Sequence, residues 1–187
     1  MIAATWSLRL NETFDSNASQ WETGVETSPQ SVVERQIVNG KYRWAVNSKG
    51  KSIDRVWSPL ANLSEFYLAV DIEHPDHLEN DLYGLTFLDT DKRFYTFGIN
   101  QRNKTYSVYY WRDGEWAIII LPTESSAIRT VEKNRLAVLL DGSYLTFYIF
   151  DQKLDSVQVD SAAKSGRVGL FIEADKNPAS IFLFDNF

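Results

Sequence analysis

The stretch RLAVLLDGSYLTFYIF, residues 135–150, decides the fold class. Apolar residues occupy every second position on both sides of Asp141-Gly142, namely Leu136, Val138, Leu140, Leu145, Phe147 and Ile149. A period of two is the pattern of a strand with one buried face. An Asp-Gly pair between two such runs is the strongest short signal for a β-hairpin, because both turn residues must adopt positive φ. The stretch therefore predicts two antiparallel strands joined by a tight turn.

The same pattern recurs along most of the chain. Asn39-Gly40 and Asp113-Gly114 each separate two further alternating runs and predict two more hairpins. The other expected strands are Trp6–Phe14, Ser31–Val38, Lys41–Val46, Ser52–Trp57, Glu65–Glu73, Tyr83–Leu88, Arg93–Asn100, Thr105–Trp111, Glu115–Leu121, Lys153–Val159, Gly166–Glu173 and Ser180–Phe187. About a dozen short strands at roughly 8–12-residue spacing are typical of a sandwich or barrel.

Length and charge exclude several classes of protein. A chain of 187 residues fits one domain, so we expect residues 1–187 to form a single β-sandwich domain, cut from a longer chain. The net charge is −6 and no Lys/Arg cluster occurs, which argues against nucleic-acid binding. No apolar run approaches the ~20 residues of a membrane span, so no membrane insertion is expected. The absence of Cys favours a bacterial or intracellular protein.

Short aromatic and glycine motifs carry a family resemblance. They are Tyr83-Gly84-Leu85-Thr86-Phe87, Tyr106-Ser107-Val108, Gly114-Glu115-Trp116, Gly166-Arg167-Val168-Gly169-Leu170-Phe171 and Phe184-Asp185-Asn186-Phe187. This pattern resembles the laminin-G-like, or concanavalin-A-like, jelly-roll modules of bacterial multidomain proteins. The resemblance implies an all-β, two-sheet antiparallel jelly-roll sandwich of the concanavalin A-like lectin/glucanase type. It also implies an extracellular or cell-surface location, and leaves function open, because one fold hosts many functions.

No catalytic residue is expected. Glycoside hydrolysis needs two carboxylates facing each other across the scissile bond. Asp71 and Glu73 share one face of an expected strand, but Asp71-Ile72-Glu73 does not match the Glu-x-Asp-x-x-Glu pattern of hydrolases with the resembled fold. His74 and His77 flank Pro75-Asp76 and are interpreted as solvated loop residues.

The resemblance also implies one structural calcium ion where the two ends of the chain meet. Calcium takes carboxylate and carbonyl oxygens, and Glu12, Asp15 and Asp185 stand near the two ends. The alternative is that Asp185 only accepts hydrogen bonds from neighbouring backbone.

Sugar binding requires an exposed aromatic face and polar groups beside it. Tyr109 and Trp111 lie on the more polar side of their strand. The solvent-facing sides of other expected strands carry Arg43, Asp71 and Glu73. These three residues are predicted to form one groove with Tyr109 and Trp111. The alternative is a solvated sheet with ordinary cross-strand pairs.

These observations favour a non-catalytic recognition module whose ligand is a carbohydrate. The alternatives are a domain that contacts another protein or domain, or has a structural role, in a larger bacterial protein, and a glycoside-hydrolase-like domain. Two structural expectations accompany this interpretation. The two ends of the chain should lie close together, and the core should include Phe87, Phe97, Leu136, Val138, Phe147, Leu170 and Phe184.

Overall fold

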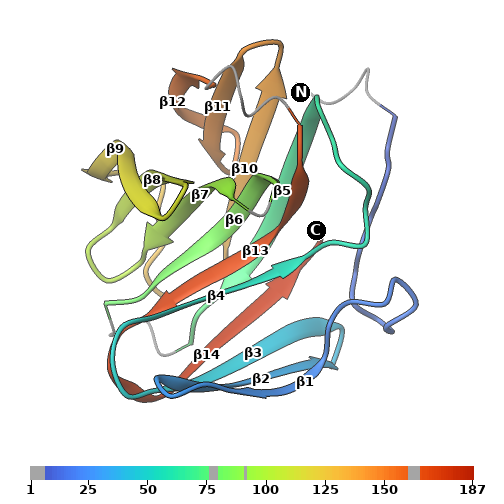
Figure 1. Cartoon of the computed structure of the whole chain (residues 1–187), viewed down its shortest axis with the longest axis vertical. Helices are drawn as coiled ribbons and strands as arrows, with labels where there is room; N and C mark the ends of the chain where they lie inside the picture. The colour runs from blue at the N-terminus through green and yellow to red at the C-terminus, as the bar shows by residue number, and fades with distance from the viewer. Residues whose placement is uncertain (1–6, 76–79, 91, 160–164) are drawn as a thin grey trace.

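Two antiparallel sheets lie face to face in the computed structural model (Figure 1). The model describes residues 7–75, 80–90, 92–159 and 165–187, and no helix occurs among them. The first sheet has the order β1-β2-β3-β14-β5-β10-β11-β12, formed by Gly24–Thr27, Ser31–Val38, Lys41–Ser48, Asn177–Asp185, Phe66–Glu73, Asn134–Asp141, Tyr144–Ile149 and Gln152–Gln158. The second has the order β4-β13-β6-β7-β8-β9, formed by Ser52–Trp57, Arg167–Ala174, Leu82–Asp89, Arg93–Asn100, Thr105–Arg112 and Glu115–Glu124.

The apolar positions of the alternating runs meet between the two sheets. Every residue that the sequence places in the core is fully buried there, namely Phe87, Phe97, Leu136, Val138, Phe147, Leu170 and Phe184. The rings of Phe87 and Phe97 both lie against that of Phe147, with centroids 6.4 and 5.0 Å away. The expected strand registers are therefore confirmed for these strands.

Two of the three predicted hairpin turns have the backbone that their sequences predict. Asn39 and Gly40 adopt φ of 53° and 68°, and Asp113 and Gly114 adopt 52° and 101°. These pairs join β2 to β3 and β8 to β9. Positive φ at both turn positions matches the right-handed twist of the flanking strands. The turn predicted at Asp141-Gly142 differs, because Asp141 still pairs with Tyr144 at the end of β10 and the turn residues are Gly142 and Ser143. Gly142 has a positive φ of 57°, whereas Asp141 does not.

The described part of the N-terminal segment lies beside the C-terminus, as expected. Glu12 and Phe187 exchange two backbone hydrogen bonds of 2.9 and 3.1 Å. The expected strand Trp6–Phe14 is wrong for its described part, because residues 7–14 form no strand. The first strand is instead β1, which pairs with β2. No helix in the described part of the chain is long and apolar enough to cross a membrane.

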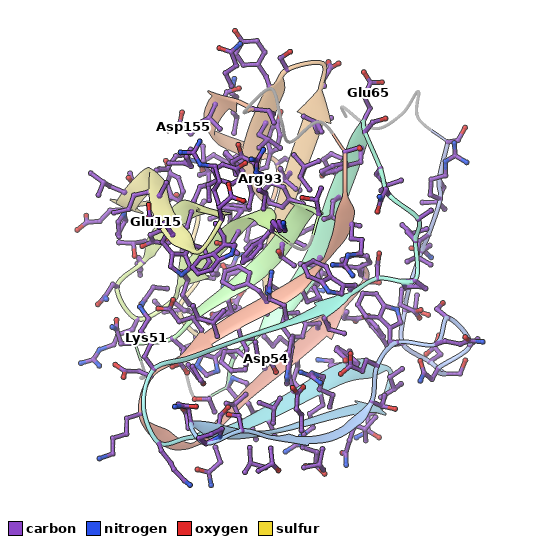
Figure 2. The ribbon with its side chains drawn as sticks, in the orientation of Figure 1. Lys51, Asp54, Glu65, Arg93, Glu115 and Asp155 are labelled. Atoms are coloured by element: carbon purple, nitrogen blue, oxygen red, sulfur yellow. The ribbon has the colours of Figure 1, made fainter. Side chains whose placement is uncertain are left out.

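An ion pair ties the edge strand β4 to the first sheet. Asp54 on β4 (Figure 2) accepts a 2.7 Å hydrogen bond from Arg35 on β2 and a 3.1 Å bond from the indole of Trp44 on β3. Consecutive residues of a strand point to opposite faces. Because Asp54 points inward, its neighbour Arg55 points to the outer face of the second sheet.

A candidate carbohydrate-binding face

The outer face of the second sheet gathers aromatic and cationic side chains. Strand alternation and the pairing registers place them together. They include Arg55 and Trp57 on β4, Arg167, Phe171 and Glu173 on β13, Leu82 and Thr86 on β6, Phe94 and Thr96 on β7, Ser107, Tyr109 and Trp111 on β8, and Trp116 and Ile118 on β9. We call this surface the aromatic face.

One end of the aromatic face is a cluster of four rings. Trp116 lies 5.1 Å from Trp111, 5.5 Å from Phe94 and 6.2 Å from Tyr109, measured between ring centroids. The indole of Trp111 also stacks on Phe94 at 6.2 Å. Phe94 is buried under the cluster, whereas 41% of Trp116 is exposed. The cluster therefore offers indole surface to a ligand on a base that packing holds in place.

The aromatic face is curved. The guanidinium carbon of Arg55 on β4 lies 3.7 Å from the ring centroid of Phe94 on β7. Three strand-to-strand steps separate β4 from β7, which is about 14 Å on a flat sheet. A bend of the sheet toward its outer side brings the two side chains together. The burial of Thr86 and Thr96, which point outward, indicates the same bend. The aromatic face is thus the concave side of the second sheet.

A row of small residues forms the floor of this hollow. Trp57, Gly169, Thr86, Thr96 and Tyr109 are consecutive partners across β4, β13, β6, β7 and β8. The three middle residues are small, and both threonines are buried although they point outward. Because both threonines are buried, neighbouring side chains cover this row, and the half-buried rings of Trp57 and Tyr109 at its ends are its accessible parts.

Two arginine side chains lie over the ring of Trp57, at the β4 end of the aromatic face. The guanidinium carbon of Arg167 lies 4.6 Å from the ring centroid of Trp57, and that of Arg55 lies 5.3 Å from it. Such cation–π contacts are worth about 0.5–2 kcal/mol each and hold the guanidinium group in place. Both arginines also make other contacts. Their donor groups are therefore positioned before any ligand arrives.

Tyr109 and Trp111 lie on the aromatic face, as the sequence predicts, and both are half-buried. Trp111 belongs to the ring cluster on the outer face and not to the core between the sheets. Ligand binding at these two residues stays a prediction.

Arg43, Asp71 and Glu73 do not join that face. They lie on β3 and β5, which belong to the first sheet, and they point to its outer side. The predicted groove of all five residues is therefore wrong. The physical reason is that the alternation of apolar and polar residues shows which face of a strand is exposed to solvent, but not which of the two sheets the strand joins.

The contacts of these three residues are cross-strand ion pairs. Asp71 accepts hydrogen bonds from Lys133 at 2.9 Å, Arg135 at 2.8 Å and Asn186 at 3.1 Å. Burial alone would raise the pKa of Asp71, but these donors hold it below its usual value. Glu73 pairs with Lys41 at 2.6 Å, and Arg43 pairs with Glu34 at 3.5 Å. This arrangement is the alternative that the sequence left open, a solvated sheet with paired charges.

The three carboxylates expected to hold calcium have separate partners. Glu12 accepts hydrogen bonds from the backbone N–H of Phe14 at 2.9 Å and the indole of Trp21 at 3.2 Å. Asp15 accepts one from Thr13, and Asp185 accepts one from the N–H of Asn186. Within the described residues, no three His, Cys, Asp or Glu side chains are grouped so that they could hold a metal ion. A structural calcium ion held by Glu12, Asp15 and Asp185 stays a prediction.

The aromatic face has few of the groups that hydrolysis needs. Glu173 is the single carboxylate among the described outward side chains of β4, β6, β7, β8 and β13. It pairs at 2.8 Å with Lys51, which stands just before β4 (Figure 2). Two carboxylates must face each other across a glycosidic bond for hydrolysis. The described outward side chains of these five strands therefore present no two carboxylates that face each other.

Sequence reasoning missed five members of the site: Arg55, Trp57, Phe94, Trp116 and Arg167. A signal was present in the alternation Ile53-Arg55-Trp57, which puts a cation and an indole on one face of an edge strand. Their partners, however, come from residues about 40 and 110 positions away in the chain. Such contacts require the strand order of the whole sheet.

The comparisons with known proteins agree on the fold. No family model matches the sequence, and no curated protein matches it either. The carbohydrate-binding module CBM66 from Bacillus subtilis superposes with a TM-score of 0.61 at 20% identity, over 88% of this chain and 93% of that one.

Two glycoside hydrolases give similar superpositions. The laminarinase catalytic domain of Thermotoga maritima has a TM-score of 0.66 at 9% identity, over 96% of both chains. The β-glucanase of Bacillus licheniformis has a TM-score of 0.61 at 9% identity, over 94% of both chains. At these identities the likeness concerns the fold alone. The chain adopts the two-sheet antiparallel jelly roll of the concanavalin A-like lectin/glucanase type.

Proposed function

We propose that this domain is a non-catalytic module that binds carbohydrate on the aromatic face. The observation that carries the proposal is the cluster of Phe94, Tyr109, Trp111 and Trp116, in which 41% of Trp116 is exposed above a buried base. A pyranose ring has an apolar C–H surface that stacks on indole and phenol rings, while its hydroxyl groups need donors and acceptors at its edge. The rings of the cluster and the guanidinium groups of Arg55 and Arg167 supply both kinds of contact.

Two further considerations support this function. One of the solved structures with the same fold is named as a carbohydrate-binding module. Among the described outward side chains of β4, β6, β7, β8 and β13, Glu173 is the single carboxylate, and it is already paired with Lys51. In this proposal the domain is part of a larger bacterial protein of the laminin-G-like kind, works outside the cell or at its surface, and targets the rest of that protein to a glycan.

Binding of the isolated domain to a glycan array, followed by calorimetry with the best oligosaccharide, tests the proposal. Trp111→Ala should abolish binding and shift the thermal midpoint by only a few degrees, roughly 5 °C or less, because the ring is half-buried. Tyr144→Ala is the matched control. Tyr144 is an exposed aromatic residue on β11 of the first sheet, and its loss should leave binding unchanged. Wild-type binding that survives both substitutions would contradict the proposed face.

A protein partner is the second candidate, and strand β9 favours it. This strand forms the edge of the second sheet, with Ile118 55% and Leu121 66% exposed. Exposed apolar edge strands are ready templates for pairing with another chain. If no glycan binds and Leu121→Lys abolishes association with a second domain of the parent protein, the interaction function replaces the carbohydrate function.

A further inference from the structure

The rings of the exposed cluster do not share one plane. Trp116 has the largest exposed fraction of the four, 41%. Its ring plane is inclined by 89° to that of Phe94 and by 82° to that of Tyr109. The angle between the ring planes of Trp116 and Trp111 is 64°. A flat ligand surface can therefore lie parallel to Trp116 or to one of the rings beside it, but not to both.

The place of the cluster on the sheet has the same consequence. The aromatic face is concave, and Trp116 stands on β9, the last strand of the second sheet. A planar surface laid over a concave face touches its two margins and misses the middle. At the opposite margin, two guanidinium groups already lie over the ring of Trp57 on β4. A planar ligand would therefore meet the accessible indole of Trp116 and no second ring of the cluster parallel to it.

Two physical forms of one polysaccharide differ in how their sugar rings can meet such a cluster. In a crystal, neighbouring chains hold the sugar rings of one crystal face parallel to one another. A separate chain rotates about its glycosidic bonds, so its consecutive rings can face in different directions. Each stacked ring raises the affinity by roughly two- to tenfold, by analogy with aromatic pairs. A separate chain can stack on Trp116 and on Tyr109 or Trp111 together, whereas a crystal face can stack on only one of them.

We infer that the ligand is a separate glycan chain, soluble or amorphous, and not the flat face of a crystalline polysaccharide. This inference rests on the proposed carbohydrate-binding function and specifies the physical form of the ligand. Trp116 stacks on one sugar unit, and Tyr109 or Trp111 contacts a unit that is turned relative to it. Phe94 is a positioning residue, because it is buried beneath the cluster and holds Trp116 in an edge-to-face contact.

The test uses the whole domain and compares soluble chains with crystalline polymers of the same chemistry. Cellohexaose is set beside microcrystalline cellulose and chitohexaose beside crystalline chitin, and laminarin is added as a soluble polymer. Calorimetry measures binding in solution, and sedimentation measures binding to the two solids. We expect at least one soluble chain to bind. Binding to either solid should be absent or weaker by about tenfold or more, because the solid cannot stack on a second ring.

Substitutions at exposed rings identify the surface that binds. Trp116→Ala should lower the affinity for the bound soluble chain by about tenfold, the upper value for one stacked ring, and Trp116→Tyr should keep most of the affinity. Tyr144→Ala, at an exposed aromatic residue of the other sheet, is the matched control and should leave the affinity unchanged. A thermal midpoint for each variant near that of the wild type excludes unfolding as the reason for a loss of binding.

The other outcomes are distinguishable. Sedimentation on crystalline cellulose or chitin that is as tight as binding of the matching soluble chain overturns the inference and leaves the carbohydrate function standing. Soluble binding that Trp116→Ala leaves unchanged also overturns it, because the exposed ring is then not used. Binding in solution of another glycan from the array, with no sedimentation on either solid, supports it. If no soluble chain, no solid and no glycan on the array binds, both proposals fail.

Discussion

The guanidinium group of Arg55 lies on the ring of Phe94, with 3.7 Å between the guanidinium carbon and the ring centroid, although two strands separate β4 from β7. This contact joins β4 to β7 across the concave face. It explains why Phe94 is buried although it points away from the core. Arg55 and the other rings of the cluster therefore pack on the same side chain, Phe94, and a substitution of Phe94 should affect both.

Phe94→Leu keeps an apolar side chain of similar length but removes the ring under Arg55 and Trp116. We expect the free energy of unfolding to fall by about 1–3 kcal/mol, because a cation–π contact and an aromatic pair are lost together. Urea unfolding measures this change. Tyr144→Leu, at an exposed aromatic residue of the other sheet, should change it by less than about 0.5 kcal/mol. Equal effects at the two positions would mean that the contact contributes nothing to stability.

Phe147→Ala tests the core. The ring of Phe147 is fully buried and lies against those of Phe87 and Phe97. Its removal should lower the free energy of unfolding by about 3–5 kcal/mol, through lost burial and the cavity left behind. Chemical denaturation with the midpoint and slope fitted together checks this value. A loss below about 1 kcal/mol would mean that the core refills the space.

Local sequence signals predict those parts of the fold that local physics controls. Asn39-Gly40 predicts its turn because few other residues tolerate positive φ at both turn positions. Phe147 is correctly placed in the core because a one-residue slip would expose its whole strand face. These signals act within about ten residues and need no knowledge of the rest of the chain.

The assembly of the site is not a local property. Asp71 on β5 pairs with Arg135 on β10 because β14 and β10 flank β5 in the first sheet, and nothing within either strand specifies that order. His74 shows the same limit. It was interpreted as a solvated loop residue, yet it is buried and stacks on Phe182 with 4.5 Å between ring centroids. Two of its partners, Ile181 and Phe182, come from a strand more than 100 residues away, and the local sequence of His74 does not indicate these contacts.

Gly98→Ala should distort the floor of the concave face. A Cβ atom at Gly98 would lie 2.7 Å from the ring of Phe171 and 3.0 Å from Leu82. We expect the free energy of unfolding to fall by about 1–3 kcal/mol from this overpacking. Gly50→Ala is the matched control, because a Cβ atom there has no neighbour within 4 Å. Thermal and urea unfolding of both variants measure this difference. If Gly98→Ala lowers the free energy of unfolding no more than Gly50→Ala does, the structure relieves the crowding at Gly98 without cost.

A buried polar cluster joins the two sheets beside His74. The carboxylate of Asp81 accepts hydrogen bonds of 2.7 Å from the hydroxyl group of Ser180 and 3.0 Å from the backbone N–H of Asp175. The imidazole Nε2 of His74 lies 3.4 Å from the same carboxylate, an ion-pair distance and longer than a close hydrogen bond. Burial by itself would raise the pKa of Asp81, but the three neighbouring groups together hold it below its usual value.

The depressed pKa of Asp81 predicts a loss of stability in acid. A carboxylate whose pKa is lower in the folded chain than in the unfolded chain stabilises the fold above its unfolded pKa of about 3.9. That contribution disappears as the pH falls through the lower, folded pKa.

Asp81→Asn lacks the charge at every pH, so we expect it to be about 1–3 kcal/mol less stable than the wild type at pH 7. The gap should narrow between about pH 5 and pH 2, because the wild-type carboxylate becomes protonated there while the amide does not change. Urea unfolding of both proteins at intervals across this range measures the gap directly, and other carboxylates cancel because both proteins contain them. A gap that stays constant down to pH 2 would show that the folded structure does not favour the ionised form of Asp81.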